Sequence, residues 1–383
     1  MAVKVLIAED SAFQRKVIAD MLSEHQDIEI VGAAKNGEEA IKMVIDYDPD
    51  VLLLDLLMPK MDGLTAFKYL IKEHPIPTII FSSFDPSALD ISVQALLEGA
   101  FDYIIKPGGI WKIEFPKFKD ELISKILLAS KSKEKINFVR SKKKIENFDI
   151  KHIVLKESIK KEKVNFDKPR EKYVSSQFLI NSENIKFNVI VIGTSVGGPK
   201  TLKLILKSIP SNFPSPILIV QHLDAYFMEK LANSLNDLCK IKVKIAEHEE
   251  DIRSSTIYLA PGGKHMDIIV KNNRPTIRIF NGAPINFCKP SIDPLFISAA
   301  HIFKDHVMGI ILTGLGNDGV EGLKIIRNEG GKTIAESKET CIVYGMPKIA
   351  IKSGAAQLSI PNYEIKKYII KFGKKLKKEL KAE

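Results

Sequence analysis

Cysteine and tryptophan are scarce in this chain of 383 residues, which has 3 cysteines and 1 tryptophan. Cys239, Cys288 and Cys341 are odd in number, far apart and without CxxC spacing, so the sequence predicts neither a disulfide framework nor a structural zinc site. Long apolar runs are also lacking, and none approaches the roughly 20 residues of a membrane-spanning helix. The apolar stretch in the start MAVKVLIAED is too short for a secretory signal. We therefore expect a cytoplasmic protein without membrane insertion.

The formal net charge of +10 is concentrated in two stretches of the chain. Residues 131–172 hold 15 Lys and Arg against 7 Asp and Glu, and residues 364–383 hold 8 Lys against 3 Glu. A balance of about −3 is left for everything else, so the basic residues belong to a linker and a tail rather than to a groove for nucleic acid.

The first part of the chain alternates apolar runs with helical patterns. The strand-like runs are VKVLIA, IEIVGAA, DVLLLD, PTIIFSS and FDYIIKP, and the helical patterns lie near residues 11–23, 37–45, after 63, near 87–97 and near 115–129. Five such pairs predict a doubly wound parallel sheet that is covered by helices on both faces. We assign residues 1–128 to this first α/β domain.

Periodicity fades over residues 129–186, a lysine-rich stretch that we interpret as a long basic linker, flexible or partly helical. It returns at Phe187 with the runs NVIVIG, SPILIVQ, TIYLAP, HVMGIILTG and KTIAES, which helical patterns separate. These runs predict a second doubly wound parallel α/β domain over residues 187–363, followed by a basic tail at 364–383. A prior of roughly 150 residues per domain suggests two or three domains for a chain of this length.

Polar residues gather where the strands of the first domain end. Glu9 and Asp10 follow the first strand, Asp55 ends the third, Ser82 ends the fourth, and Lys106 follows the fifth. Since functional groups of parallel sheets lie outside the carboxyl ends of the strands, we expect these side chains to converge. Three converging carboxylates repel each other unless a hard cation joins them, and Mg²⁺ beside an ammonium group is what phosphoryl transfer to Asp55 requires.

The motifs AEDS, DLLMPKMDG, FSS and YIIKP resemble the receiver domain of bacterial two-component response regulators. The resemblance implies that Asp55 accepts a phosphoryl group. It gives the other residues these roles: Glu9, Asp10 and Asp55 bind Mg²⁺, Ser82 and Tyr103 carry the conformational switch, and Lys106 contacts the phosphoryl group. Receivers more often have Asp where this chain has Glu9, which keeps the charge but has a longer reach.

The stretch NVIVIGTSVGGPKTL at 188–202 has the pattern of a strand, a glycine-bracketed turn and a helix. Such a turn either cradles a phosphate at the helix N-terminus or presents a serine hydroxyl as a nucleophile. The stretch lacks the lysine of GxxxxGK[ST], and its glycines do not match GxGxxG, so a phosphate cradle is poorly specified. We favour Ser195 as a nucleophile.

Ser195, His222 and Asp318 each follow a different predicted strand of the second domain. They supply a hydroxyl nucleophile, an imidazole base and a carboxylate that orients the imidazole, which is the composition of a catalytic triad. The order along the chain differs from that of α/β-hydrolases, but geometry and roles define a triad. His265, in the glycine-rich APGGKH, is an alternative base that the residues alone leave open.

The motifs IGTSVGGP, QHL, LAPGGKHM, KPSIDPLF, LTGLGNDGVEGL and VYGMP occur in this order over about residues 187–360. They resemble the catalytic domain of the chemotaxis protein-glutamate methylesterases, which also act as protein-glutamine glutaminases. The resemblance implies the triad Ser195, His222 and Asp318, and a Rossmann-like domain after a flavodoxin-like receiver. Val196 stands where Thr is usual and Leu315 where Met is usual, and their backbone amides are the candidate donors of an oxyanion hole.

By this resemblance the chain is a phosphorylation-regulated serine hydrolase that demethylates glutamate methyl esters and deamidates glutamines on chemoreceptors during chemotactic adaptation. The chemotaxis histidine kinase would be the phosphodonor, and the unphosphorylated receiver would block the catalytic face. The catalytic domain would need no cofactor, and we expect a monomer that binds no nucleic acid. Two alternatives stay open: a nucleic-acid-binding output domain, and an adaptor whose triad is inactive.

Overall fold

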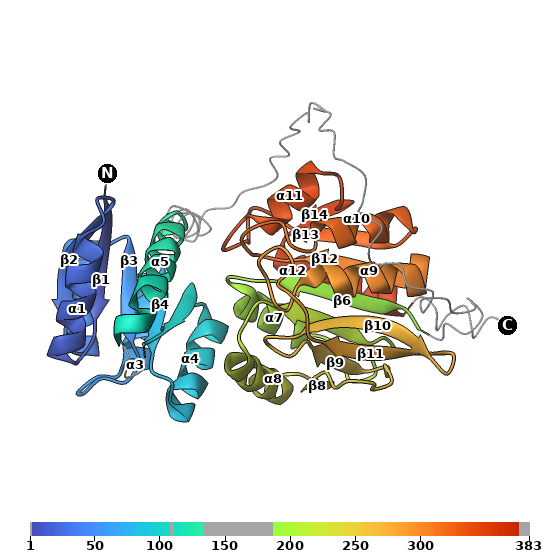
Figure 1. The fold of residues 1–383 in the computed structure, drawn as a ribbon, viewed down its shortest axis with the longest axis horizontal. Helices are drawn as coiled ribbons and strands as arrows, with labels where there is room; N and C mark the ends of the chain where they lie inside the picture. The colour runs from blue at the N-terminus through green and yellow to red at the C-terminus, as the bar shows by residue number, and fades with distance from the viewer. Residues whose placement is uncertain (1, 108–110, 134–186, 375–383) are drawn as a thin grey trace, which may run out of the picture. The chain divides into compact units, whose positions relative to one another are not determined.

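The structure is a computed structural model that describes residues 2–107, 111–133 and 187–374. Most of the predicted linker lies outside the described residues. Two parallel sheets organise the described part, one before and one after the linker (Figure 1). Among the described helices, none combines the length and the hydrophobicity that a membrane span requires.

The first sheet has five strands in the order β2-β1-β3-β4-β5, which is the flavodoxin-like order that the receiver resemblance implies. Its pairings from β2 to β4 are parallel. The strands are β1 Val3–Ala8, β2 Ile28–Ala34, β3 Val51–Asp55, β4 Thr78–Ser82 and β5 Asp102–Ile105. Every residue of β3 and β4 is buried, because helices cover both faces of a doubly wound sheet.

The helices that alternate with these strands begin where the sequence supplies capping residues. They are α1 Ala12–Ser23, α2 Gly37–Tyr47, α3 Gly63–Glu73, α4 Pro86–Glu98 and α5 Trp111–Ser130. Side chains of Ser11, Asn36, Asp62 and Asp85 accept backbone N–H groups at the first four N-termini. At the start of α3 a Cβ on Gly63 would lie 2.0 Å from the carbonyl oxygen of Asp55, so only glycine lets the chain return this close to the end of β3.

The second sheet has seven strands in the order β14-β13-β12-β6-β7-β9-β8, and all its pairings are parallel. The strands are β6 Val189–Thr194, β7 Ile217–Gln221, β8 Lys242–Ile245, β9 Thr256–Leu259, β12 Val307–Ile311, β13 Lys332–Glu336 and β14 Leu358–Ile360. The chain starts at β6, builds outward through β7, and then returns to the other side of β6 with β12. The strand order therefore reverses between β6 and β12, which is where ligands bind in open α/β sheets.

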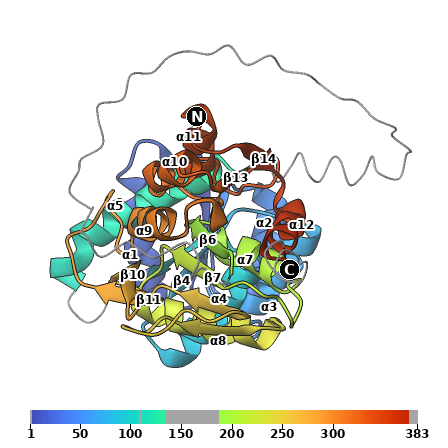
Figure 2. The same ribbon diagram turned by 90° about the vertical axis from the view of Figure 1, so that its right-hand side faces the viewer.

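Helices cover both faces of the second sheet. They are α7 Gly198–Leu206, α8 Ala225–Leu238, α9 Ile292–Phe303, α10 Val320–Asn328, α11 Met346–Lys352 and α12 Asn362–Gly373, with a 3₁₀ turn, η3, at Lys304–His306. Figure 2 shows α9 and α10 on one side of β6 and α7 and α12 on the other. The main apolar core lies under α9, where Leu295, Phe296 and Ala299 are fully buried.

A β-hairpin departs from the purely parallel second domain that the sequence analysis predicts. Strands β10 His265–Lys271 and β11 Arg274–Phe280 pair antiparallel and form a separate two-stranded sheet. The turn residues Asn272 and Asn273 both have positive φ, at 51° and 58°, as a tight two-residue hairpin turn requires. Asparagine tolerates this conformation, so the Asn-Asn pair was the available signal for the hairpin.

Two predicted boundaries also differ from the structure. Helix α5 continues to Ser130, beyond the predicted end of the first domain at residue 128. The predicted limit at residue 363 falls inside α12, where Ile365 and Ile369 are fully buried one turn apart. Residues 364–373 are therefore part of the second domain rather than of a tail, because the apolar stripe of α12 outweighs its exposed lysines.

Candidate active site

The serine of the second domain lies on a tight turn between β6 and α7. The amide of Ser195 donates to the carbonyl oxygen of Thr313 at 3.0 Å, and the carbonyl oxygen of Ser195 accepts from the amide of Gly198 at 2.9 Å. Gly197 bends the chain with a φ of 78°, which glycine adopts without strain. The Gln221 side chain donates to the Ser195 carbonyl oxygen at 2.9 Å. The turn is thus fixed by Thr313, which follows β12, and by Gln221, the last residue of β7.

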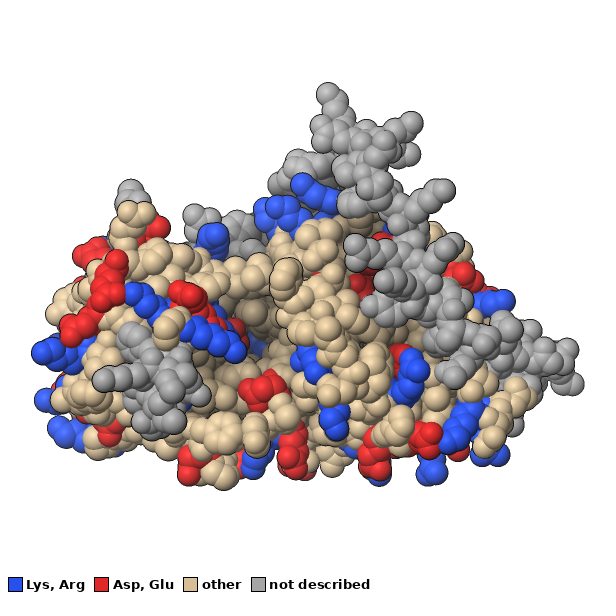
Figure 3. Space-filling view, viewed as in Figure 1, with Lys and Arg blue, Asp and Glu red and all other residues tan. Residues whose placement is uncertain are grey.

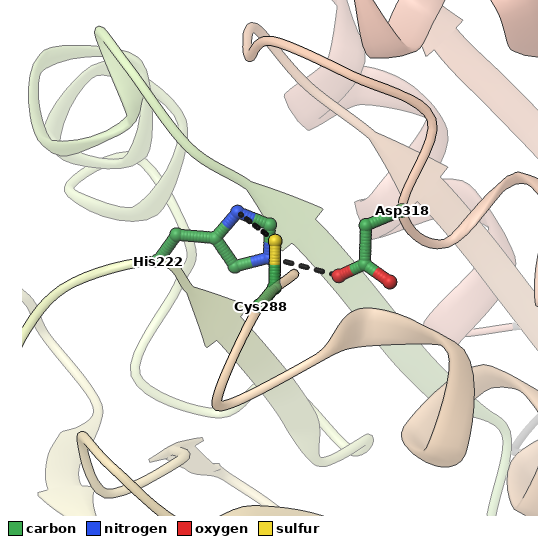
Figure 4. A group of neighbouring side chains, drawn as sticks. All are labelled: His222, Cys288 and Asp318. Carbon is green, nitrogen blue, oxygen red and sulfur yellow. Dashed lines mark hydrogen bonds and ion pairs between the residues drawn. The ribbon is translucent and has the colours of Figure 1, made fainter. Parts of the chain in front are cut away.

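His222 and Asp318 meet at the carboxyl edge of the same sheet. His222 follows β7, Asp318 follows the loop after β12, and His222 Nε2 lies 2.8 Å from Asp318 Oδ2 (Figure 4). Asp318 is 2% exposed. Because Asp318 holds Nε2 of the His222 ring, Nδ1 is the ring nitrogen that faces away from the carboxylate.

Four donors surround the carboxylate of Asp318. Oδ1 accepts from Asn286 Nδ2 at 3.0 Å and from Ser291 Oγ at 2.6 Å, and Oδ2 accepts from His222 and from the Ile292 amide at 2.7 Å. A carboxylate offers about four acceptor sites, so all of them are used. Burial alone would raise the pKa of Asp318, but the hydrogen bond from His222 and the other donors lower it below its usual value.

The electrostatics of this group favour a charged pair. Burial lowers the pKa of His222, yet hydrogen bonds with Asp318 and Cys288 outweigh that effect and raise it to about 9. Asp293 is a second buried carboxylate close by, and burial together with the charge of Asp318 raises its pKa to about 7. Asn286 Nδ2 bridges the two acids, at 2.7 Å from Asp293 Oδ2. The negative charge of Asp318 therefore makes Asp293 harder to ionise.

Ser195 lies at the next strand end, but its hydroxyl is not hydrogen-bonded to the histidine. Among the hydrogen bonds of the described residues, none joins Ser195 Oγ to His222, and Nδ1 instead lies 3.6 Å from Cys288 Sγ. Hydrogen bonds between catalytic groups are often long until a substrate is present. The structure thus brings two of the three predicted triad members into contact and places the third on the adjacent turn.

The two predicted oxyanion donors lie on the turns that flank this site. Val196 is half-buried, and its carbonyl oxygen accepts from Thr313 Oγ1 at 2.9 Å. Leu315 is 53% exposed. In the part of the chain that the structure describes, neither the Val196 amide nor the Leu315 amide donates a hydrogen bond within the protein. Both N–H groups are therefore available to an oxyanion.

The alternative base His265 has a structural environment instead. It is fully buried at the start of β10, where Nε2 lies 3.0 Å from the carbonyl oxygen of Ala283 and Nδ1 accepts from the Ser291 amide at 3.2 Å. Both ring nitrogens are thus engaged with the backbone. This histidine fixes the backbone of Ser291, whose hydroxyl donates to Asp318.

Several residues of the site were missed by the sequence analysis. Ser291 and Asp293 belong to the quoted motif KPSIDPLF but had no assigned role, and Asn286 and Cys288 precede that motif. Cys288 was interpreted only as one of three isolated cysteines. Its contact with His222 spans 66 residues, and no spacing rule reports a contact over that separation.

The acidic group of the first domain also assembles. Carboxylate oxygens of Glu9, Asp10 and Asp55 lie within 4.8 Å of one another. Lys106 Nζ lies 2.7 Å from Asp55 Oδ2 and 2.8 Å from Glu9 Oε2. Burial lowers the pKa of Lys106, but the two carboxylates outweigh it and raise that pKa. Burial also raises the pKa of Glu9. Three carboxylates beside one ammonium group leave the pocket with an excess of acidic groups.

The predicted switch residues lie at the ends of β4 and in β5. Ser82 is 2% exposed, and its hydroxyl donates to the Ser83 carbonyl oxygen at 3.2 Å and accepts from Ser92 Oγ at 2.9 Å. Tyr103 is half-buried in β5. Their switch roles stay predictions.

Comparisons with known proteins agree with both resemblances. Residues 5–114 match the response regulator receiver domain family, and residues 190–369 match the family described as CheB methylesterase. The protein-glutamate methylesterase/protein-glutamine glutaminase of Oceanobacillus iheyensis is 38% identical over 371 residues, which are 96% of this chain and 98% of that protein. That of Thermotoga maritima is 33% identical over 368 residues, again 96% and 98% of the two chains.

Among solved structures, the Thermotoga maritima CheB methylesterase catalytic domain is 37% identical, with a TM-score of 0.48, and covers 49% of this chain and 99% of that one. Two relatives above 30% identity match nearly the full length of this chain, and each of its two sheets falls within one of the two matched families. The chain therefore belongs to the protein-glutamate methylesterase/protein-glutamine glutaminase family, with a response regulator receiver domain followed by a CheB methylesterase domain.

Proposed function

We propose that this chain hydrolyses glutamate methyl esters, and deamidates glutamines, on chemoreceptors through Ser195, His222 and Asp318. The observation that carries the proposal is the 2.8 Å contact of His222 Nε2 with Asp318 Oδ2, at the sheet edge where Ser195 follows the neighbouring strand. Strand order reverses at this edge, so a substrate can reach all three residues from one side.

The reaction is acyl transfer in two steps. Ser195 Oγ forms a bond to the γ-carbonyl carbon of the ester while His222 Nδ1 takes the hydroxyl proton, and methanol then leaves with that proton. Water attacks the γ-glutamyl serine ester, His222 takes a proton from the water, and Ser195 recovers it as the acid is released. With a glutamine substrate, ammonia leaves in place of methanol. Asp318 holds the ring and stabilises the imidazolium of each step.

Charge that develops on the carbonyl oxygen needs donors fixed in advance. The unoccupied amides of Val196 and Leu315 support their assignment to the oxyanion hole, because the backbone supplies the donor whatever the side chain. Val196 and Leu315 differ from the residues usual in the family only in side chain, so both departures are compatible with catalysis. The exposed Leu315 and the fully exposed Phe287 offer apolar contacts beside the site to a receptor helix.

We further propose that phosphorylation of Asp55 by a histidine kinase controls the esterase. The donor set of Glu9, Asp10 and Asp55 is all oxygen, which suits Mg²⁺. When bound, Mg²⁺ neutralises charge on the transferring phosphoryl oxygens. Lys106, held between two of these carboxylates, can turn to the phosphoryl group and stabilise it. We place this reaction in the cytoplasm, on the side of the membrane where the kinase and the receptor helices would lie.

The catalytic assignment is tested with a fluorophosphonate probe that labels activated serines. We expect the wild-type chain to be labelled at Ser195, and the variant His222→Ala to lose the label because no base takes the hydroxyl proton. The variant His248→Ala, at an exposed histidine whose ring accepts from the Ile279 amide, is the matched control and should keep the label. Absence of label at Ser195 in the wild type would favour an adaptor with an inactive triad.

Regulation is tested with a small-molecule phosphodonor such as acetyl phosphate and with the variant Asp55→Asn. We expect the phosphodonor with Mg²⁺ to raise the esterase rate of the wild type and to leave that of Asp55→Asn unchanged. An equal response of both proteins would remove the regulatory role of Asp55.

A further inference from the structure

Cys288 lies against the ring nitrogen that the proposed mechanism uses. Its Sγ is 3.6 Å from His222 Nδ1, while Asp318 holds the opposite nitrogen (Figure 4). The three residues form one of two groups among the described residues that are able to hold a metal ion, with ligand atoms within 4.8 Å of one another. The other group is the all-oxygen cluster of the first domain.

The separation of the sulfur and the nitrogen fits a tetrahedral zinc ion. Zinc binds cysteine sulfur at about 2.3 Å and histidine nitrogen at about 2.0–2.1 Å, so two such ligands at a tetrahedral angle are about 3.5 Å apart. The observed 3.6 Å matches the separation that one bound ion requires of these two atoms. The thiol would lose its proton to solvent as the ion binds.

Asp318 lies where a zinc-binding histidine usually has a hydrogen-bond acceptor for its other ring nitrogen. Histidine ligands almost always donate their other ring N–H to a carboxylate or carbonyl, which orients the ring and makes the free nitrogen a better ligand. Here Asp318 accepts from Nε2, and its four hydrogen bonds fix the carboxylate in turn. The lone pair of Nδ1 is thereby aimed at the side of the ring where Cys288 lies.

The loop that carries Cys288 is held in place and is open to solvent. Ile285 and Cys288 exchange two backbone hydrogen bonds, of 2.9 and 3.0 Å, so the position of the cysteine backbone is defined. Cys288 is half-buried and its neighbour Phe287 is fully exposed. An ion from solvent can therefore reach the pair, and water can fill its two remaining positions.

The ligand atoms of His222 and Cys288 disfavour Mg²⁺, the ion that suits the carboxylates of the first domain. Thiolate and imidazole prefer zinc and similar softer ions, whereas carboxylate oxygens suit Mg²⁺. An excess of Mg²⁺ should therefore fill the acidic cluster and leave the pair of His222 and Cys288 free for zinc.

We propose that His222 and Cys288 form a binding site for Zn²⁺, and that the bound ion inhibits the esterase by occupying the nitrogen of the catalytic base. The inhibition rests on the proposed function, whereas binding does not. The bound ion would also cover the Cys288 sulfur, which gives binding a readout that is independent of catalysis.

Binding is tested by alkylation of the full-length chain with iodoacetamide in excess Mg²⁺, with and without added Zn²⁺. Mass spectrometry of the peptides then gives the labelling rate of each cysteine. We expect Zn²⁺ to slow the labelling of Cys288 by at least about tenfold, and of half-buried Cys239 by less than about twofold. Equal effects of Zn²⁺ on both cysteines, or no effect on Cys288, would overturn the site.

Inhibition is tested in the esterase assay, with each protein compared with its own rate without zinc. We expect Zn²⁺ to inhibit the wild type and Cys239→Ala alike, and Cys288→Ala to need at least about tenfold more Zn²⁺ for the same inhibition. Equal sensitivity of Cys288→Ala would overturn the inhibitory role. A wild type that is inactive without zinc would instead contradict the proposed function, and the labelling experiment would still report on the site.

Discussion

The two buried aspartates of the second domain should respond in opposite ways to the same substitution. Asp318 is ionised, with a pKa below its usual value, whereas burial and the charge of Asp318 raise the pKa of Asp293 to about 7. Asn286 donates to both, so they share one environment. Replacement of each by asparagine therefore separates the role of charge from that of shape.

The cost of Asp318→Asn follows from its four donors. An amide group in place of either oxygen puts N–H groups against two donors, and two lost hydrogen bonds to a charged group cost about 3–6 kcal/mol. The low end applies if the new amide replaces Oδ1, because the Ser291 hydroxyl can rotate and accept from it. The histidine also loses its ion partner, so we expect kcat to fall by about 10³–10⁴.

The matched variant Asp293→Asn should be mild. The raised pKa of Asp293 means that its contribution to stability is full below the unfolded pKa of 3.8 and is lost as the pH rises through about 7. The asparagine side chain does not ionise, so the variant does not lose stability in this pH range. We therefore expect it to cost no more than about 1.5 kcal/mol at pH 5.5, one hydrogen bond at most, and to be relatively more stable at pH 8.5.

Calorimetry of the full-length variants at pH 5.5, 7 and 8.5 measures these differences, with the transition of the unmodified first domain as internal reference. The esterase rate is measured on the same samples. The reasoning would be refuted by two variants that lose the same stability and the same activity, or by an Asp293→Asn variant that loses relative stability as the pH rises.

Three further predictions concern the groups around the catalytic edge. The esterase kcat/KM should rise about tenfold per pH unit below a pKa of about 9 and then level off, because His222 accepts a proton only when neutral; a profile that is flat from pH 6 to 8 would contradict this. Gly198→Ala should lower stability by about 1–3 kcal/mol and reduce kcat, because its Cβ would lie 1.9 Å from Gln221 Oε1. The control Gly282→Ala, whose nearest neighbour would be at 3.4 Å, should do neither. Glu336→Ala should destabilise the second domain by about 3 kcal/mol or more in calorimetry, because the fully buried carboxylate accepts from three donors, and Glu336→Gln should cost less; equal costs would show that these hydrogen bonds do not matter.

The positions of the functional side chains could be predicted better than the residues that hold these side chains in place. Continuous apolar runs such as VLLLD and VIVIG form interior parallel strands, so the residues that follow them had to meet at the carboxyl edges. That rule accounts for Asp55 beside Lys106 and for His222 beside Asp318. It needs only that the strands run parallel, which the helical patterns between them imply.

The support of Asp318 was not predictable in this way. Ser291 and the Ile292 amide reach it from 27 and 26 residues earlier in the chain, after the antiparallel hairpin of β10 and β11, which was not predicted. Cys288 lies on that same loop. Contacts of this kind depend on how a loop packs, which neither hydrophobic period nor strand order determines.

The charge counts agree with the mixed charges on the surface, but they led to the assignment of residues 364–373 to a tail. On the face drawn in Figure 3, blue and red side chains of the described residues are interspersed, as the near-neutral balance outside the linker and tail predicts. The lysines of α12 nevertheless concealed its buried stripe of Ile365 and Ile369. A helix with one apolar stripe belongs to the folded domain whatever its net charge.

The most direct test of the central claim is the release of methanol from methylated chemoreceptor by the wild type and by Ser195→Ala. The exposed Ser211, which precedes β7 at the opposite edge of the sheet, gives the control Ser211→Ala. We predict that Ser195→Ala falls to the background rate while Ser211→Ala matches the wild type. Methanol release by a folded Ser195→Ala at the wild-type rate would contradict the assignment of Ser195 as the nucleophile.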